Sequence, residues 1–131
     1  MPDGQGHSEG IGERVRAALD SADLDAIADL LDPAVRWGAP DDHAFDCQNR
    51  SEVLAWYQRG RDAGTRARVT EVIVRGDRML VGLRVSGNAA AKQAGGEMQR
   101  WQVMTLAGER VIDIRGFDDR ELAAARAGVP S

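Results

Sequence analysis

Alternation of apolar and polar residues in the second half of the chain constrains the fold more than any other feature. Residues 67–75 alternate with a period of two, and a turn at Gly76-Asp77 follows. The strand predicted after this turn has one wholly apolar side, made of Met79, Val81, Leu83 and Val85. A period of two is typical of β-strands that are buried on one side. The alternation therefore predicts an antiparallel hairpin.

Residues 100–120 predict a second hairpin with its turn at Ala107-Gly108. Its apolar positions are Trp101, Val103, Ile112 and Ile114. The alternating positions carry charge, at Arg100, Asp113 and Arg115. Because antiparallel sheets commonly bury one side only, we expect the apolar residues to form a concave wall and the charged residues to lie on the convex face. A β-bulge would invert this assignment beyond the bulge.

Helical spacing dominates the first half of the chain. Apolar residues predict a first helix from Ile11 to about Asp20 and a second, capped by Ser21 or Asp23, that ends before Pro33. Further along the chain we expect a short strand at 34–37, a polar loop at 38–46, and a helix to about Asp62 that begins with an Asn49-x-x-Glu52 capping box. Residues 87–96 are expected to be a flexible connection, and Asp118 is expected to cap a last helix over 119–127.

Composition excludes several classes of function. The chain has 131 residues, with 21 acidic and 17 basic side chains in mixed order, so it has no basic stripe for nucleic acid. One cysteine and two isolated histidines exclude an internal disulfide and predict no metal site, and the redox setting is most simply cytosolic. No run of 18 apolar residues predicts a membrane span. Residues 1–9 are expected to form a flexible tail before a single domain at 10–131.

Candidate acid and base groups gather in the polar loop. His43 and Asp46, beside Asp42, could move a proton at the mouth of a pocket, and Tyr57 on the third predicted helix could donate one. A neighbouring carboxylate raises the pKa of a histidine and fixes its tautomer, which suits a general base. Asp-rich loops of this kind are, however, more often solvated turns. The single Cys47 is interpreted as a small buried hydrophobe.

Three tryptophans give a second candidate signal. Trp37, Trp56 and Trp101 come from three predicted elements, and they could be ordinary core residues. Rings that line a cleft would instead offer flat apolar walls to a ring-containing ligand. Both interpretations remain open at this point.

Three local patterns give the chain a family resemblance: Leu30-Leu31-Asp32-Pro33-Ala34-Val35-Arg36-Trp37, then Asn49-Arg50-Ser51-Glu52-Val53-Leu54-Ala55-Trp56-Tyr57, then Gly108 with Ile114-Arg115-Gly116-Phe117-Asp118-Asp119-Arg120 and Ala127-Gly128. In this order they resemble the nuclear transport factor 2-like superfamily, in its SnoaL-like branch. The resemblance covers about residues 11–128. It implies an α+β fold in which a cone-shaped, curved antiparallel sheet wraps around an N-terminal helical hairpin and a third helix. It also implies a pocket between sheet and helices and, often, a homodimer formed through the outer sheet face.

Relatives in this superfamily include steroid isomerases, polyketide cyclases, epoxide hydrolases, dehydratases and proteins that only bind, so the resemblance implies no single activity. In the steroid isomerases a carboxylate base lies on the first strand, and Trp37 occupies the matching position here. Their tyrosine donor on the first helix also has no counterpart, because the only tyrosine is Tyr57. Isomerase chemistry is therefore not carried over to this chain.

Three hypotheses follow for function. The first is a cofactor-free and metal-free pocket that binds a small apolar, ring-containing molecule, lined by Trp37, Trp56, Tyr57, Val85, Trp101, Val103, Ile112 and Ile114. The second is a cofactor-independent isomerase, cyclase or hydrolase that uses Asp46 or His43 with Tyr57. The third is a dimeric interaction module whose pocket is filled by side chains. In each case we expect the homodimer contacts on the convex face, at Arg84, Arg100, Asp113 and Arg115.

Overall fold

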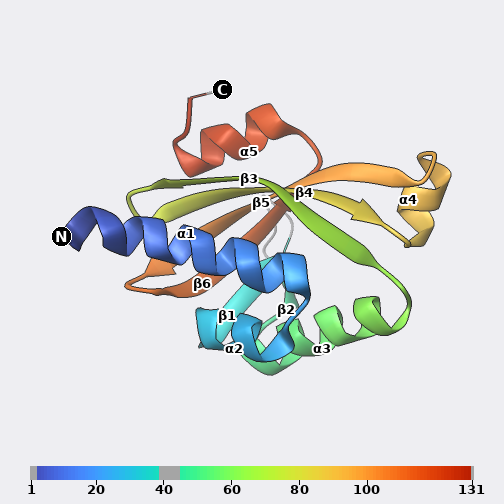
Figure 1. Ribbon diagram of the computed structural model, residues 1–131, viewed down its shortest axis with the longest axis horizontal. Helices are drawn as coiled ribbons and strands as arrows, with labels where there is room; N and C mark the ends of the chain where they lie inside the picture. Colours follow the sequence, from blue (N-terminus) through green and yellow to red (C-terminus); the bar gives the residue numbers. More distant parts are fainter. Residues whose placement is uncertain (1–2, 39–44, 131) are drawn as a thin grey trace.

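A six-stranded sheet organises the protein (Figure 1). The computed structural model describes residues 3–38 and 45–130. Its helices are α1 (Asp3–Ser21), α2 (Leu24–Leu30), α3 (Arg50–Asp62), α4 (Ala89–Gln93) and α5 (Arg120–Ala127). Its strands are β1 (Leu31–Gly38), β2 (Phe45–Cys47), β3 (Arg66–Arg75), β4 (Arg78–Ser86), β5 (Glu97–Ala107) and β6 (Arg110–Phe117).

Strand order in the sheet is β2-β1-β6-β5-β4-β3. The two predicted hairpins, β3-β4 and β5-β6, are antiparallel as expected. β1 departs from the expectation, because it pairs with β6 in parallel. These two strands are far apart in sequence, so no tight turn forces them to run in opposite directions. With its helices and its curved sheet, the structure confirms the predicted α+β class.

Helices cover both sides of the sheet. α1, α2 and α3 lie on one side, which we call the inner face, and α5 lies on the other, the outer face (Figure 1). The inner face holds the larger core, which includes Val15, Val35, Val53 and Ile114. The outer face holds a second core, in which Leu80, Val103 and Phe117 pack against the alanines of α5. Apolar residues are therefore buried on both faces of the central strands.

Local sequence signals explain where the helices begin and end. The Asp23 carboxylate accepts hydrogen bonds from the backbone N–H groups of Asp25 and Ala26 and caps α2. Asn49 caps α3 by accepting from Glu52 N at 2.9 Å, as the capping-box spacing predicts. α5 ends at Gly128, whose φ of 72° is a left-handed conformation that glycine adopts at little cost.

Several predicted boundaries were wrong. α1 begins at Asp3, so helix extends into the segment for which composition predicts a flexible tail; the flexibility itself stays a prediction. β1 begins at Leu31, directly after α2. The expected flexible connection at 87–96 contains the short helix α4, whose first turn is held by a hydrogen bond from Ala91 N to Asn88 Oδ1. The cap of α5 is Asp119, one residue later than predicted.

The face assignment of β5 was also wrong. Arg100 pairs with Leu83, so both lie on the inner face, together with Gln102. Trp101 and Val103 therefore point to the outer face, where they pack with the core under α5. The physical reason is that α5 covers this part of the outer face, so apolar character does not mark the inner side of β5.

The pairing register between β5 and β6 is irregular, and it determines on which face of the sheet each β6 side chain lies. Val111 pairs with Leu106 and Asp113 with Thr105, which leaves Ile112 as an extra residue between them. Ile114 lies on the inner face, as expected, whereas Ile112 belongs to neither core. Asp113 and Arg115 lie on the outer face as expected, and they form an ion pair with each other at 2.9 Å.

Candidate functional site

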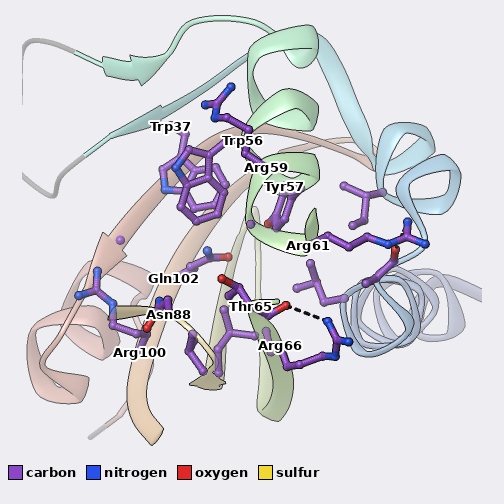
Figure 2. Close-up of a pocket in the computed structure, with 18 of the residues that line it drawn as sticks. Trp37, Trp56, Tyr57, Arg59, Arg61, Thr65, Arg66, Asn88, Arg100 and Gln102 are labelled. Carbon is purple, nitrogen blue, oxygen red and sulfur yellow. Dashed lines mark hydrogen bonds between the residues drawn. The ribbon is translucent and has the colours of Figure 1, made fainter. Parts of the chain in front are cut away.

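A pocket of about 680 Å³ opens between the inner face of the sheet and the helices (Figure 2). Its walls come from the end of α1, from α2 and α3, and from the inner positions of the sheet strands. Apolar side chains include Leu19, Leu24, Ile27, Leu83, Val85 and Met98. A concave, mostly apolar cavity with a few polar groups is the usual form of a small-molecule site.

An aromatic cluster of Trp37, Trp56 and Tyr57 forms one side of the pocket (Figure 2). The ring centroids of Trp37 and Trp56 are 4.6 Å apart, and those of Trp37 and Tyr57 are 5.4 Å apart. Trp56 and Tyr57 meet edge to face at 5.7 Å. Trp56 keeps 46% of its surface exposed, an unusual fraction for so large an apolar side chain. The cluster therefore presents aromatic surface that the protein itself does not cover.

Tyr57 is the half-buried hydrogen-bonding group of the cluster. Burial raises the pKa of its phenol well above the ordinary value, and a hydrogen bond from the Gln102 amide only partly opposes this rise. The phenol therefore stays protonated throughout the physiological pH range. It can donate a hydrogen bond to a bound molecule but cannot act as a base.

Gln102 supports this arrangement from β5. It is the buried polar residue of the described core, with 7% of its surface exposed. Its Oε1 atom is buried without a hydrogen-bond partner among the described residues. Leaving a buried acceptor unpaired is costly, so a purely structural role would favour an apolar residue here. Gln102 and Tyr57 together supply hydrogen-bonding groups to a mostly apolar pocket.

Arg100, Trp37 and Gly116 define the floor of the pocket next to the aromatic cluster. A side-chain Cβ placed on Gly116 would lie 3.5 Å from Arg100 Nη2 and 3.9 Å from Trp37 Nε1. Two nitrogen donors therefore converge on backbone that carries no side chain. We call this arrangement the cradle.

Most of the remaining charges around the pocket are positive. Arg59, Arg61 and Arg66 line it in addition to Arg100. Among the described lining residues the acidic side chain is Asp20, and its carboxylate accepts a hydrogen bond from Val69 N at 2.7 Å. The described part of the pocket is therefore electropositive.

The predicted pocket residues divide into two groups. Trp37, Trp56, Tyr57, Val85 and Trp101 are among the lining residues. Trp101 nevertheless directs its indole to the outer face, where Nε1 donates to Glu71 Oε2 at 3.3 Å. The other three lie elsewhere: Val103 under α5, Ile112 at the irregularity of β6, and Ile114 fully buried in the inner core.

The candidate acid and base residues of the loop are not located by the structure. His43 and Asp42 lie outside the described residues, and so does the side chain of Asp46, whose backbone belongs to β2. Cys47 is buried in the inner core and lines the pocket. Within residues 3–38 and 45–130, no three His, Cys, Asp or Glu side chains gather as metal ligands would.

Sequence reasoning missed Arg100, Gln102 and Gly116 as pocket residues. The signal that could have found them is the pairing register, since Gln102 lies opposite Val81 on one side and Gly116 on the other. Val81 was assigned correctly to the inner face, so correct pairing would have placed Gln102 there too.

Outside the pocket, one ion pair anchors α5 to the sheet. Arg120 Nε and Nη2 donate to the two Glu71 carboxylate oxygens at 2.8 and 2.9 Å. These hydrogen bonds hold the pKa of Glu71 below its ordinary value, against the opposing effect of partial burial. The pair fixes the first turn of α5 over β3.

Comparison with known proteins places the chain in a family. Residues 13–114 match the SnoaL-like domain. No curated protein matches the sequence. No helix among the described residues has the length and apolar character needed to cross a membrane.

Solved structures share the fold. A protein from Sinorhizobium meliloti, proposed to be a polyketide cyclase, is 23% identical with a TM-score of 0.64, and the match covers 82% of this chain and 94% of that one. A proposed SnoaL-like polyketide cyclase from a Jannaschia species is 18% identical with a TM-score of 0.69, over the full length of both chains. A proposed ketosteroid isomerase from Kribbella flavida is 14% identical with a TM-score of 0.69, covering 86% of this chain and 77% of that one.

At these identities the likeness establishes the fold and not an activity. The family match is independent of it and spans most of the sequence. The chain belongs to the SnoaL-like domain family.

Proposed function

We propose that this SnoaL-like protein binds a small, apolar, ring-containing molecule in the pocket between sheet and helices. The observation that carries the proposal is the aromatic cluster, which offers partly exposed ring surface to a cavity of about 680 Å³. This volume lies within the range of drug-sized ligand sites. An open cavity of this size also argues against the third hypothesis, in which side chains fill the pocket.

A neutral fluorescent probe, N-phenyl-1-naphthylamine, tests this function. We expect saturable one-to-one binding that Trp37→Ala weakens about tenfold or more, because a lost aromatic contact and its buried area exceed about 1.4 kcal/mol. Val85→Trp should also block binding by filling the cavity. Leu122→Ala is the matched control, because Leu122 is exposed on α5. Equal binding by wild type and all three variants would mean that the probe binds outside the pocket.

Catalysis is the second candidate, and Tyr57 favours it. Its phenol, whose raised pKa keeps it protonated at physiological pH, faces the pocket, where it could stabilise negative charge that develops on a substrate oxygen. Asp46 or His43 would then exchange the proton. The proposed cyclase and isomerase activities of the structural relatives suggest the substrates to try. Turnover that survives Tyr57→Phe, Asp46→Asn and His43→Ala would remove these residues from the mechanism.

We also propose a cytoplasmic homodimer that associates through the outer face. Arg84 is exposed there, and Asp113 and Arg115 form their ion pair on the same face. Arg100 no longer belongs to this surface, because it lines the pocket. Light scattering on wild type and Arg84→Glu tests the association. A wild-type mass of 14.2 kDa in solution would contradict it.

A further inference from the structure

We infer that the cradle at Gly116 binds a carboxylate, so that the pocket selects aromatic acids over their neutral analogues. This inference rests on the proposed function and specifies the ligand class. Its basis is the convergence of Arg100 Nη2 and Trp37 Nε1 on a glycine whose missing side chain leaves the position open. Arginine binds carboxylates in planar, often bidentate geometry.

Neither donor of the cradle is used elsewhere in the described structure. Among residues 3–38 and 45–130, Arg100 has no ion pair and Trp37 Nε1 donates no hydrogen bond. Arg100 is half-buried on the inner face of β5. A cation withdrawn from water is destabilising unless an anion or acceptor compensates for the loss of hydration. A ligand carboxylate would supply that compensation.

The surrounding charges favour the same class of ligand. The other arginines of the pocket, Arg59, Arg61 and Arg66, add positive potential, and the Asp20 carboxylate is engaged by Val69 N. A cleft lined by one sign of charge concentrates ligands of the opposite sign. The described residues therefore supply attraction for an anion and little repulsion.

Trp37 connects the cradle to the aromatic cluster. Its ring packs against Trp56 and Tyr57 (Figure 2). Its Nε1 lies 3.9 Å from where a Cβ on Gly116 would be. A ligand whose rings contact the cluster would therefore hold a directly attached carboxylate close to the cradle. This geometry points to a compact aromatic carboxylate and not to an acid on a long flexible chain.

Isothermal titration calorimetry with two matched probes, 2-naphthoate and 2-naphthamide, tests the inference. We expect wild type to bind the naphthoate about tenfold or more tightly than the naphthamide, as a charge-assisted contact allows. Arg100→Gln should abolish this preference, because it weakens naphthoate binding more than naphthamide binding. Arg84→Gln removes the same charge from the outer face of the neighbouring strand and should keep the preference.

Gly116→Ala gives a second test that does not alter charge. The added methyl group would make only ordinary contacts with Arg100 and Trp37, so the protein should fold, yet the methyl group would occupy the cradle. We expect this variant, too, to lose the preference for naphthoate. Circular dichroism melting curves verify that each variant is folded.

The outcomes separate the two proposals. If wild type binds both probes equally, or if Arg100→Gln and Gly116→Ala keep the preference for naphthoate, the cradle is not the carboxylate site, although the pocket still binds aromatic molecules. If wild type binds neither these probes nor N-phenyl-1-naphthylamine, the proposed function fails and the carboxylate inference fails with it.

Discussion

Replacing Leu80 with alanine should destabilise the protein strongly and leave the residues that line the pocket unchanged. Leu80 is fully buried in the outer core, between β4 and the alanines of α5. Leucine-to-alanine changes in cores cost about 2–5 kcal/mol, depending on how far the surroundings collapse into the cavity. α5 packs closely on the sheet through three alanines, Ala123, Ala124 and Ala127. Their methyl side chains are too short to fill the cavity that Leu80→Ala would leave. We therefore expect a loss of about 3 kcal/mol.

Thermal and urea denaturation measure this loss. For 131 residues the unfolding entropy is about 0.28 kcal/mol/K, so a loss of about 3 kcal/mol lowers Tm by about 11 °C. The urea midpoint should fall with an unchanged slope. Leu122→Ala, on the exposed side of α5, should change stability by less than about 0.5 kcal/mol. If Leu80→Ala costs no more than this control, α5 does not form a core with the sheet.

Three further changes test local features. Glu71→Gln should lower the free energy of unfolding, with the largest loss above pH 4.5. The loss should shrink as pH falls through the depressed pKa of Glu71, because the wild-type carboxylate then becomes protonated. Urea denaturation at several pH values measures the loss, and a loss that does not vary with pH would contradict the pairing of Glu71 with Arg120. Asn49→Ala removes the cap of α3 and should lower the free energy of unfolding, measured by urea denaturation, by about 1 kcal/mol. An unchanged free energy would mean that the Glu52 N–H finds another hydrogen-bond acceptor. Gly87→Ala should destabilise far more than Gly116→Ala, since Gly87 has a φ of +84° and its new Cβ would collide with Gly64 O; similar melting curves would refute this.

Local signals allowed much of the fold to be predicted. The Asn49 cap, the Gly76 turn and the apolar inner side of β4 depend on residues close together in sequence, and the structure confirms them. The parallel pairing of β1 with β6 depends on residues about 80 positions apart, and no local pattern reports it. The family resemblance supplied the overall architecture that these local signals alone leave open.

The site could be predicted only in part, and β5 shows why. Trp101 and Val103 are more apolar than Arg100 and Gln102, so hydrophobicity alone assigned them to the inner face. The assignment was wrong because α5 buries the outer face, and because the pocket tolerates polar residues that a packed core would exclude. The aromatic cluster was found because three large rings are visible in any sequence. Gly116 was missed because its contribution is the absence of a side chain between Arg100 and Trp37.

Thiol accessibility on β5 tests the inner placement of Arg100 and the use of the pocket together. In a Cys47→Ala background, Arg100→Cys and Gln99→Cys place single thiols at adjacent positions, on the inner and outer faces of one strand. We expect N-phenyl-1-naphthylamine to slow the reaction of the thiol at position 100 with a disulfide reagent and to leave position 99 unaffected. Protection at position 99 alone, or at neither position, would contradict the placement of the binding pocket on the inner face of the sheet.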